Sequence, residues 1–141
     1  MGKRREGREA AVQFLFQDDL NKAQPAALAA AFDEFWKLRE SAPKTRHFAT
    51  ALIQGVLEHQ EAIDERIRKV ADHYELHRIA TVDRNILRVA IYEMIYSNEV
   101  PPVVCINEAI EIAKRFGSED SGRFVNGILD RLKEESARPL R

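Results

Sequence analysis

Apolar residues recur at helical spacing along most of the chain, and no window keeps the two-residue alternation of a half-buried strand. The pattern predicts an all-α protein of about seven helices, with no repeat at a solenoid period. We expect the helices to cover residues 5–20, 25–40, 45–59, 60–73, 81–99, 103–116 and 119–135. The third and fourth segments follow each other so closely that a helical hairpin and a bent helix both fit.

The segment 81–99 is the most apolar of the seven. Its apolar residues cover two adjoining stripes, where most of the other segments show one. A helix that is hydrophobic over such a wide arc belongs in the interior. The pattern therefore predicts that this helix is central to the fold. The residues on the two stripes are Ile86, Val89, Ala90, Ile91, Met94 and Ile95.

Proline and glycine mark where helices stop and restart. Pro101 and Pro102 fit a turn and a first helical position but not a helix interior, and Gly117 fits the end of the helix that follows. The window "VPPVVCI" is rich enough in β-branched residues to form an edge strand. The helical spacing from Ile106 onward favours a helix instead.

Asn126 and Gly127 lie inside the last predicted helix, "EDSGRFVNGILDRLKEE". A glycine in a helix interior costs about 1 kcal/mol relative to alanine. Close approach of another helix, or of a ligand, would account for it.

Length and composition indicate one soluble globular domain spanning residues 1–141. Apolar residues make up 45% of the chain and charged residues 32%, which is too apolar for a disordered protein. Cys105 is the only cysteine, so an intrachain disulfide is impossible and a reducing cytoplasm is the expected location. No run of 18 apolar residues occurs, so we expect no membrane-spanning helix.

Positive charge is concentrated at the start of the chain. The stretch "KRREGRE" holds four of the 22 basic residues, while the whole chain has a formal net charge of −1. Basic residues at the start of a helix oppose its macrodipole, which favours acids there. A solubilising terminus explains the cluster about as well as a phosphate-binding surface does.

Candidate catalytic chemistry is sparse. His73 and His77 have a spacing compatible with metal ligands, but the HExxH pattern is absent, and a solvated surface pair is the better interpretation. Cys105 is more typical of a small core residue than of a nucleophile. No P-loop or G-x-G-x-x-G motif is present. We therefore predict no catalytic residue, no metal and no cofactor.

Three stretches together resemble one family over nearly the whole chain. They are "RREGREAAVQFLF", "DRNILRVAIYEM" and "VPPVVCINEAIEIAKRFGSEDSGRFVNGILDRL". With the chain length, they resemble NusB, the bacterial transcription antitermination factor family. The carboxyl-terminal third carries the most specific part of the likeness, and residues 18–45 contribute little.

The resemblance implies an all-helical fold of two packed three-helix bundles and a function without catalysis. NusB-like proteins pair with a small-subunit ribosomal protein, called NusE in this role. The pair binds the boxA element of nascent single-stranded RNA. The complex joins RNA polymerase with other Nus factors and suppresses premature termination, notably on ribosomal RNA operons.

By the same resemblance, two groups of side chains are expected to bind RNA. Basic residues of the first helix would contact phosphates, and polar and aromatic residues around the last loop would read bases. Asp120 repels phosphate, so it either caps the last helix, which we favour slightly, or accepts a base amino group. The expected RNA-binding residues are Lys3, Arg4, Arg5, Arg8, Gln13, Phe116, Ser118, Asp120 and Phe124.

Four further residues are implied in binding NusE. Phe16 and Asp83 match positions that the family uses, and Arg84 and Arg88 lie nearby as candidate rim charges. Phe16 stands where a tyrosine is common, so packing is retained but a hydroxyl hydrogen bond is lost. Periodicity alone leaves open whether Phe16 is a partner contact or core.

Two other hypotheses compete with that of an antitermination factor. NusB-like domains also precede some ribosomal RNA cytosine methyltransferases, so the chain could be an accessory domain of an RNA-modifying enzyme. Alternatively it is a helical interaction module, such as a homodimer, without independent RNA binding. A homodimer could bury the basic helix.

Overall fold

The computed structural model describes residues 2–21, 28–71, 75–97 and 99–137, without the side chains of Asn21 and of residues 135–137. Within these ranges every regular element is helical, which confirms the predicted fold class. None of the helices there is long and apolar enough to cross a membrane. The α-helices are α1 (Lys3–Asn21), α2 (Leu28–Lys37), α3 (Pro43–Glu58), α4 (Gln60–Val70), α5 (Thr81–Tyr92), α6 (Pro102–Phe116) and α7 (Ser121–Ala137). Two short elements are the 3-10 helix η2 (Leu76–Arg78) and the π-helical turn η3 (Glu93–Ser97).

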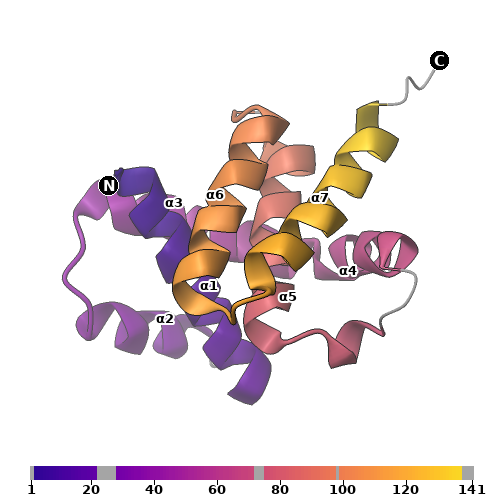
Figure 1. The fold of residues 1–141 in the computed structure, drawn as a ribbon. Coiled ribbons are helices and arrows are strands. Elements are labelled where there is room, and N and C mark those ends of the chain that lie inside the picture. The colour runs from indigo at the N-terminus through magenta and orange to yellow at the C-terminus, as the bar shows by residue number, and fades with distance from the viewer. Residues whose placement is uncertain (1, 22–27, 72–74, 98, 138–141) are drawn as a thin grey trace.

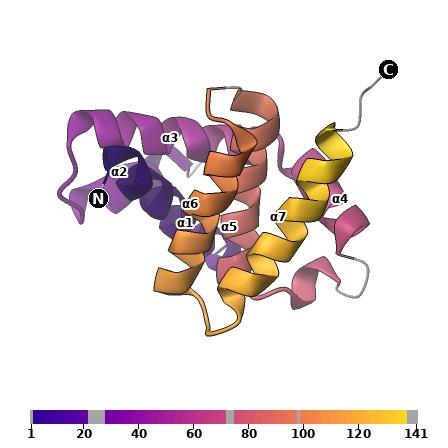
Figure 2. The ribbon, with the colours of Figure 1, turned by 45° about the horizontal axis from the view of Figure 1, so that its top comes forward.

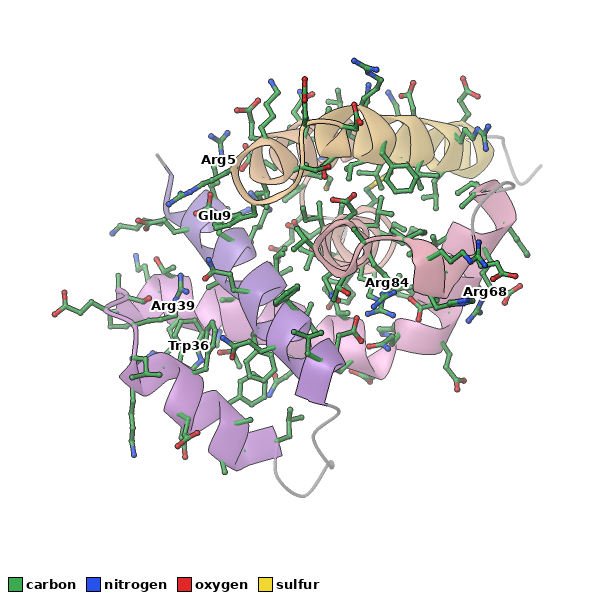
Figure 3. The ribbon with its side chains drawn as sticks, turned by 60° about the horizontal axis from the view of Figure 1, so that its bottom comes forward. Arg5, Glu9, Trp36, Arg39, Arg68 and Arg84 are labelled. Carbon is green, nitrogen blue, oxygen red and sulfur yellow. The ribbon has the colours of Figure 1, made fainter. Side chains whose placement is uncertain are left out.

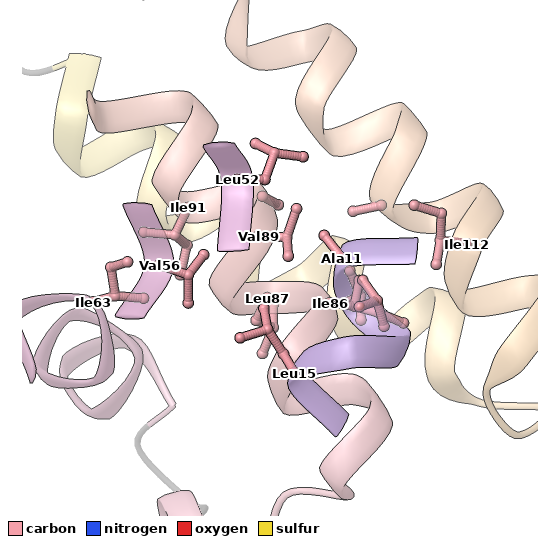
Figure 4. Packing of buried hydrophobic residues seen from close by; sticks show 14 of the residues in the cluster. Ala11, Leu15, Leu52, Val56, Ile63, Ile86, Leu87, Val89, Ile91 and Ile112 are labelled. Atoms are coloured by element: carbon pink, nitrogen blue, oxygen red, sulfur yellow. The ribbon is translucent and has the colours of Figure 1, made fainter. Parts of the chain in front are cut away.

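Helix α5 is the central element, as its two apolar stripes predict. It packs against α1, α3, α4, α6 and α7, so it joins the helices before it in the chain to the two that follow it (Figures 1 and 2). Apolar side chains of α1 and α3 converge on it from one side (Figure 4). These neighbours bury its apolar stripes, while its polar side chains Arg84, Asn85 and Arg88 pair with acids inside the fold. The labelled contacts include Ala11, Leu15, Leu52, Val56, Ile86, Leu87 and Val89.

Most predicted helix boundaries agree with the structure to within a few residues. Helix α6 starts at Pro102, which confirms the helical interpretation of "VPPVVCI" over the strand. Helices α3 and α4 meet end to end at His59, whose φ of −110° and ψ of 15° interrupt the helix, so the bent helix is the better description. Helix α2 ends at Lys37, and Arg39 therefore lies beyond it. Pro25 and His73 fall outside the described residues.

A buried ionic network joins α1, α4 and α5. Arg88 donates to Asp64 at 2.8 and 2.9 Å and to Asp19 at 2.9 Å, and Arg84 donates to Asp19 at 3.0 Å. Asn85 donates to Asp19 at 3.2 Å. Removing one partner of such a buried pair leaves the other charge uncompensated, which typically costs about 3–5 kcal/mol. The network therefore fixes the register of α1 and α4 on the central helix.

Close approach explains some glycines and not others. Gly117 ends α6 with a φ of −93°, and a Cβ there would lie 2.3 Å from the Ser121 hydroxyl oxygen. At Gly55 of α3, a Cβ would lie 2.1 Å from the Tyr92 ring. At Gly127 nothing in the described chain comes within 4 Å. The close helix packing considered for Gly127 is therefore absent there, and it occurs instead at Gly55.

This contrast predicts opposite effects of the same substitution. Gly55→Ala should lower the free energy of unfolding by about 1–3 kcal/mol, because the new methyl overlaps the Tyr92 ring. Gly127→Ala should raise it by up to about 1 kcal/mol through helix propensity alone. Urea titration of both variants measures this. Equal effects at the two positions would contradict the packing described for Gly55.

The network also predicts a pH dependence. Burial raises the pKa of Asp19, but the Arg88 charge and hydrogen bonds from Arg84 and Asn85 outweigh it and leave that pKa below its usual value. A carboxylate with a lowered pKa contributes stability that is fully present above about pH 4 and is lost as pH falls through the folded-state pKa. Asp19→Asn should therefore flatten the acid limb of the unfolding free energy against pH. An unchanged acid limb in chemical denaturation would disprove the assignment.

Candidate nucleic-acid and partner interface

The four basic residues at the start of α1 fall into two pairs with different surroundings. Arg5 and Arg8 turn toward α6 and η3, where they pair with acids, and Figure 3 shows Arg5 beside α6. Lys3 and Arg4 stay exposed, with the Arg4 guanidinium 5.4 Å from the centre of the Phe48 ring of α3. Only part of the charge predicted for RNA is therefore available to solvent.

Arg8 is an interior residue. The residue is 4% exposed, and its side chain donates to Glu93 at 2.6 and 3.0 Å and to Glu108 at 3.4 Å. Burial alone lowers the pKa of Arg8, but the hydrogen bonds and charge of Glu93 outweigh this and raise it. The Arg8 guanidinium already pairs with two carboxylates in the interior, so it offers no phosphate contact at the surface. The direct phosphate contact predicted for Arg8 is therefore corrected to a structural role.

Arg5 is half-buried in a bidentate pair. Its guanidinium donates to Glu108 at 2.9 and 2.7 Å. The hydrogen bond from Arg5 is the main reason why the pKa of Glu108 lies below its usual value. Part of Arg5 still meets solvent, but its two best-directed donors are already in use.

A second ion pair joins α1 to α6, further along the junction of these two helices. Glu9 accepts from Arg115 at 2.9 and 3.1 Å. The Arg115 guanidinium then lies 5.1 Å from the centre of the Phe116 ring. Arg115 was not predicted as a site residue from the sequence, although it directly precedes Phe116, a predicted RNA-binding residue, at the end of the helix. This junction connects the basic start of α1 to the loop that joins α6 to α7 (Figure 1).

A groove of about 670 Å³ follows the junction on its α2 side. Gln13 and Phe116, predicted for RNA, line it together with Phe16, predicted for the partner. Phe16 is half-buried and lies outside the core cluster, so it is not a core residue, and its contact with a partner stays a prediction. The other lining residues were not predicted as site residues, and they include Leu38, which is 89% exposed, and Arg39, which donates to the Gln13 side-chain oxygen.

The loop between α6 and α7 and the first turn of α7 hold the remaining predicted RNA residues. Ser118 and Asp120 are exposed, and Phe124 is half-buried against the core. The Ser118 backbone N–H donates to the Ser121 hydroxyl at 2.9 Å. Ser121 thus holds the turn, and the side chain of Asp120 makes no hydrogen bond to the rest of the described chain. The Asp120 side chain therefore does not make the helix-capping hydrogen bond that we favoured for it.

Asp83 combines burial with an unused acceptor. It lies in the first turn of α5 and is 8% exposed. Its Oδ1 atom is buried and has no hydrogen-bond partner within the described residues. A buried carboxylate oxygen without a donor is costly, so such an atom marks a place where a donor from another molecule would be favoured. Its neighbour Val82 lines the groove that contains Phe16.

Arg84 and Arg88 do not form the exposed rim that the sequence predicted. Arg88 is 4% exposed and is held by Asp64 and Asp19. Arg84 donates to Asp19 and to the backbone oxygens of Leu76 and Ile79. Helical spacing placed both near Asp83, but they turn to the inner side of α5. Their role is to anchor that helix.

The described residues contain no group of three acidic, histidine or cysteine side chains that could hold a metal. His77 is exposed in η2 and lies 3.3 Å from Glu75. Cys105 is buried, and burial raises the pKa of its thiol to about 11. A thiol with that pKa is rarely ionised at neutral pH.

The comparisons with known proteins agree on one family. The model of the NusB family matches residues 5–134. The chain is 44% identical over 136 residues to the transcription antitermination protein NusB of Desulfosudis oleivorans, covering 96% of this chain and 88% of that protein. It is 48% identical over 138 residues to the protein of the same name from Desulforamulus reducens, covering 95% and 94%.

Solved structures agree with this. A Thermotoga maritima NusB superposes with a TM-score of 0.82 at 37% identity, covering 94% of this chain and 91% of that one. A chain of a crystal structure of the antitermination factors NusB and NusE in complex with double-stranded RNA gives a TM-score of 0.79 at 26% identity, covering 96% of this chain and 98% of that one. The fold, the motifs and these matches together show that the chain belongs to the NusB family.

Proposed function

We propose that this chain is a transcription antitermination factor that binds boxA RNA together with the ribosomal protein NusE. It acts by binding and not by catalysis. The assembled complex joins RNA polymerase and other Nus factors in the cytoplasm and suppresses premature termination, notably on ribosomal RNA operons.

The groove between α1 and α2 is the observation that carries the proposal. Gln13 and Phe116, assigned to RNA, and Phe16, assigned to the partner, line the same groove. Two ligands bound at one groove can contact each other as well as the protein. Such an arrangement accounts for binding in which the partner strengthens the hold on RNA.

The RNA side of the proposal uses two kinds of contact. Lys3 and Arg4 are exposed cations at the tip of α1, suited to phosphates but unable to read sequence. Phe116, Phe124, Gln13 and Ser118 offer aromatic faces and polar groups for splayed bases of a single strand. The exposed carboxylate of Asp120 is suited to a base amino group.

The partner side centres on Asp83 and Phe16. The unused Oδ1 of Asp83 accepts a hydrogen bond from a backbone or side-chain donor of NusE. The Phe16 ring offers apolar area in the groove that Val82, the neighbour of Asp83, also lines, without the hydroxyl of a tyrosine. A homodimer that uses the same surface would compete with NusE.

The direct test is fluorescence anisotropy of a labelled boxA single strand, titrated with the chain alone and then with purified NusE. A scrambled strand and a boxA duplex serve as controls, the duplex because the related complex holds double-stranded RNA. Binding that tightens and becomes sequence-selective with NusE supports the proposal. No RNA binding in either condition would leave a helical interaction module as the better account.

Arg4→Ala and Arg8→Ala should behave differently. Arg4→Ala removes an exposed cation, so RNA affinity should fall and the salt dependence of log K should flatten by about 0.7, with little change in Tm. Arg8→Ala leaves the buried Glu93 unpaired and should lower stability by about 3–5 kcal/mol. Thermal melts and anisotropy at two salt concentrations separate the two effects. A stable Arg8→Ala variant would contradict the structural role.

Asp83→Asn should weaken NusE binding and leave the fold intact. The amide keeps the size of the side chain but replaces one acceptor oxygen with a donor and removes the charge. Because Oδ1 has no partner in the free chain, stability should not fall. Calorimetric titration with NusE measures the dissociation constant, and Asp130→Asn on the exposed part of α7 is the matched control. Identical dissociation constants for Asp83→Asn and the control would remove Asp83 from the interface.

A further inference from the structure

We propose that a hollow between the starts of α1 and α3 is a phosphate subsite that takes one backbone phosphate of the bound RNA. The inference rests on the proposed function and adds Lys44 and Thr45 to the RNA-binding residues. The hollow has a volume of about 300 Å³ and is lined by Lys3, Arg4, Lys44, Thr45 and Phe48.

The charges around the hollow have one sign. Lys3 and Arg4 come from α1 and Lys44 comes from α3, 40 residues further along the chain from Arg4. No acidic residue lines the hollow. None of the three cations has an ion-pair partner among the described residues, whereas Arg5 and Arg8 of the same helix are paired. The fold therefore collects unpaired positive charge at this place from two separate segments.

The two helix starts add backbone donors. Ala42 is the N-cap of α3, its side chain makes no capping hydrogen bond, and Pro43 follows it. The first turn of α3 contains no acidic residue. Gly2, which precedes α1, also has no side chain that could cap. Uncapped N–H groups at a helix start, together with the helix dipole, favour an anion there.

Thr45 provides the independent sign of a missing ligand. It is 4% exposed, and its hydroxyl is buried without a hydrogen-bond partner in the described chain. A buried hydroxyl normally finds an acceptor, because leaving it unpaired costs about 1–3 kcal/mol. Since Thr45 lines the hollow, a phosphate oxygen bound there would supply that acceptor.

The position of the hollow favours RNA as the source of the phosphate. Lys3 and Arg4 belong to both the hollow and the RNA surface proposed for the tip of α1, so a strand bound on that surface passes this point. The start of α1 lies near α3 in the ribbon (Figures 1 and 2). Phe48 forms the apolar wall and holds the Arg4 guanidinium over its ring. Free inorganic phosphate has the same chemistry, and the experiment separates the two sources.

The first arm of the experiment measures boxA RNA binding in the presence of NusE at two salt concentrations. Lys44→Ala should weaken binding about fourfold at 0.15 M salt and flatten the slope of log K against log salt by about 0.7, as one lost phosphate contact does. Lys69→Ala, an exposed lysine of α4 away from the hollow, is the matched control and should change neither.

The second arm uses Thr45→Val, which keeps the shape and removes the hydroxyl. Because that hydroxyl has no partner in the free chain, the free energy of unfolding should stay equal or rise while RNA affinity falls. The third arm titrates the wild-type chain with sodium phosphate against sodium chloride of equal ionic strength. The amide NMR signals of Lys44 and Thr45 should shift saturably with phosphate only.

The outcomes separate this inference from the proposed function. Wild-type affinity in both Lys44→Ala and Thr45→Val, with RNA still bound, overturns the subsite and leaves the proposed function standing. Saturable phosphate shifts without any effect of the variants on RNA binding indicate a free-phosphate site and overturn RNA as the occupant. If the wild-type chain binds no RNA, the proposed function and the RNA occupant fail together.

Discussion

The buried pair of Arg8 and Glu93 is the contact on which the exposed surface depends. Two charges taken out of water must satisfy each other, and the guanidinium does so by donating to both carboxylate oxygens of Glu93. Glu93 opens the π-helical turn after α5, so the pair fixes the first helix to the end of the central one. Arg8 is buried, whereas Lys3 and Arg4, which lie about one helical turn before it, face solvent. The same side-chain type therefore builds the fold at one position and faces solvent at another.

Much of the fold could be predicted because it follows from local spacing. The two apolar stripes of α5 predicted its central position, and Pro102 predicted the start of α6. What spacing cannot provide is the identity of distant partners, since Glu93 lies 85 residues from Arg8 in sequence. It also cannot locate a π-helical turn, which depends on where a buried side chain must point. The end of α2 at Lys37, earlier than expected, has no sequence signal that we can identify.

The candidate site was predicted less completely for the same reason. Sequence resemblance identified Gln13, Phe16 and Phe116, and these residues do share a groove. It could not tell which arginines are exposed, because Arg84 and Arg88 differ from Arg4 only in the acids that the fold brings to them. Lys44 was overlooked because it follows a proline in a segment that looked like a helix end. The sequence signal for Lys44 was a helix start that carries a basic residue and no acidic one, which favours an anion there.

The division of charge has a consequence for how the surface can select RNA. Pairing inside the fold removes Arg5 and Arg8 from the field at the tip of α1, and Lys44 adds to it from another segment. Such cations attract any phosphate and give no preference for sequence. In the function proposed above, selectivity would come from the groove between α1 and α2, which offers aromatic and amide groups. A partner seated at Asp83 would close that groove from its other side, which links partner binding to the reading of bases.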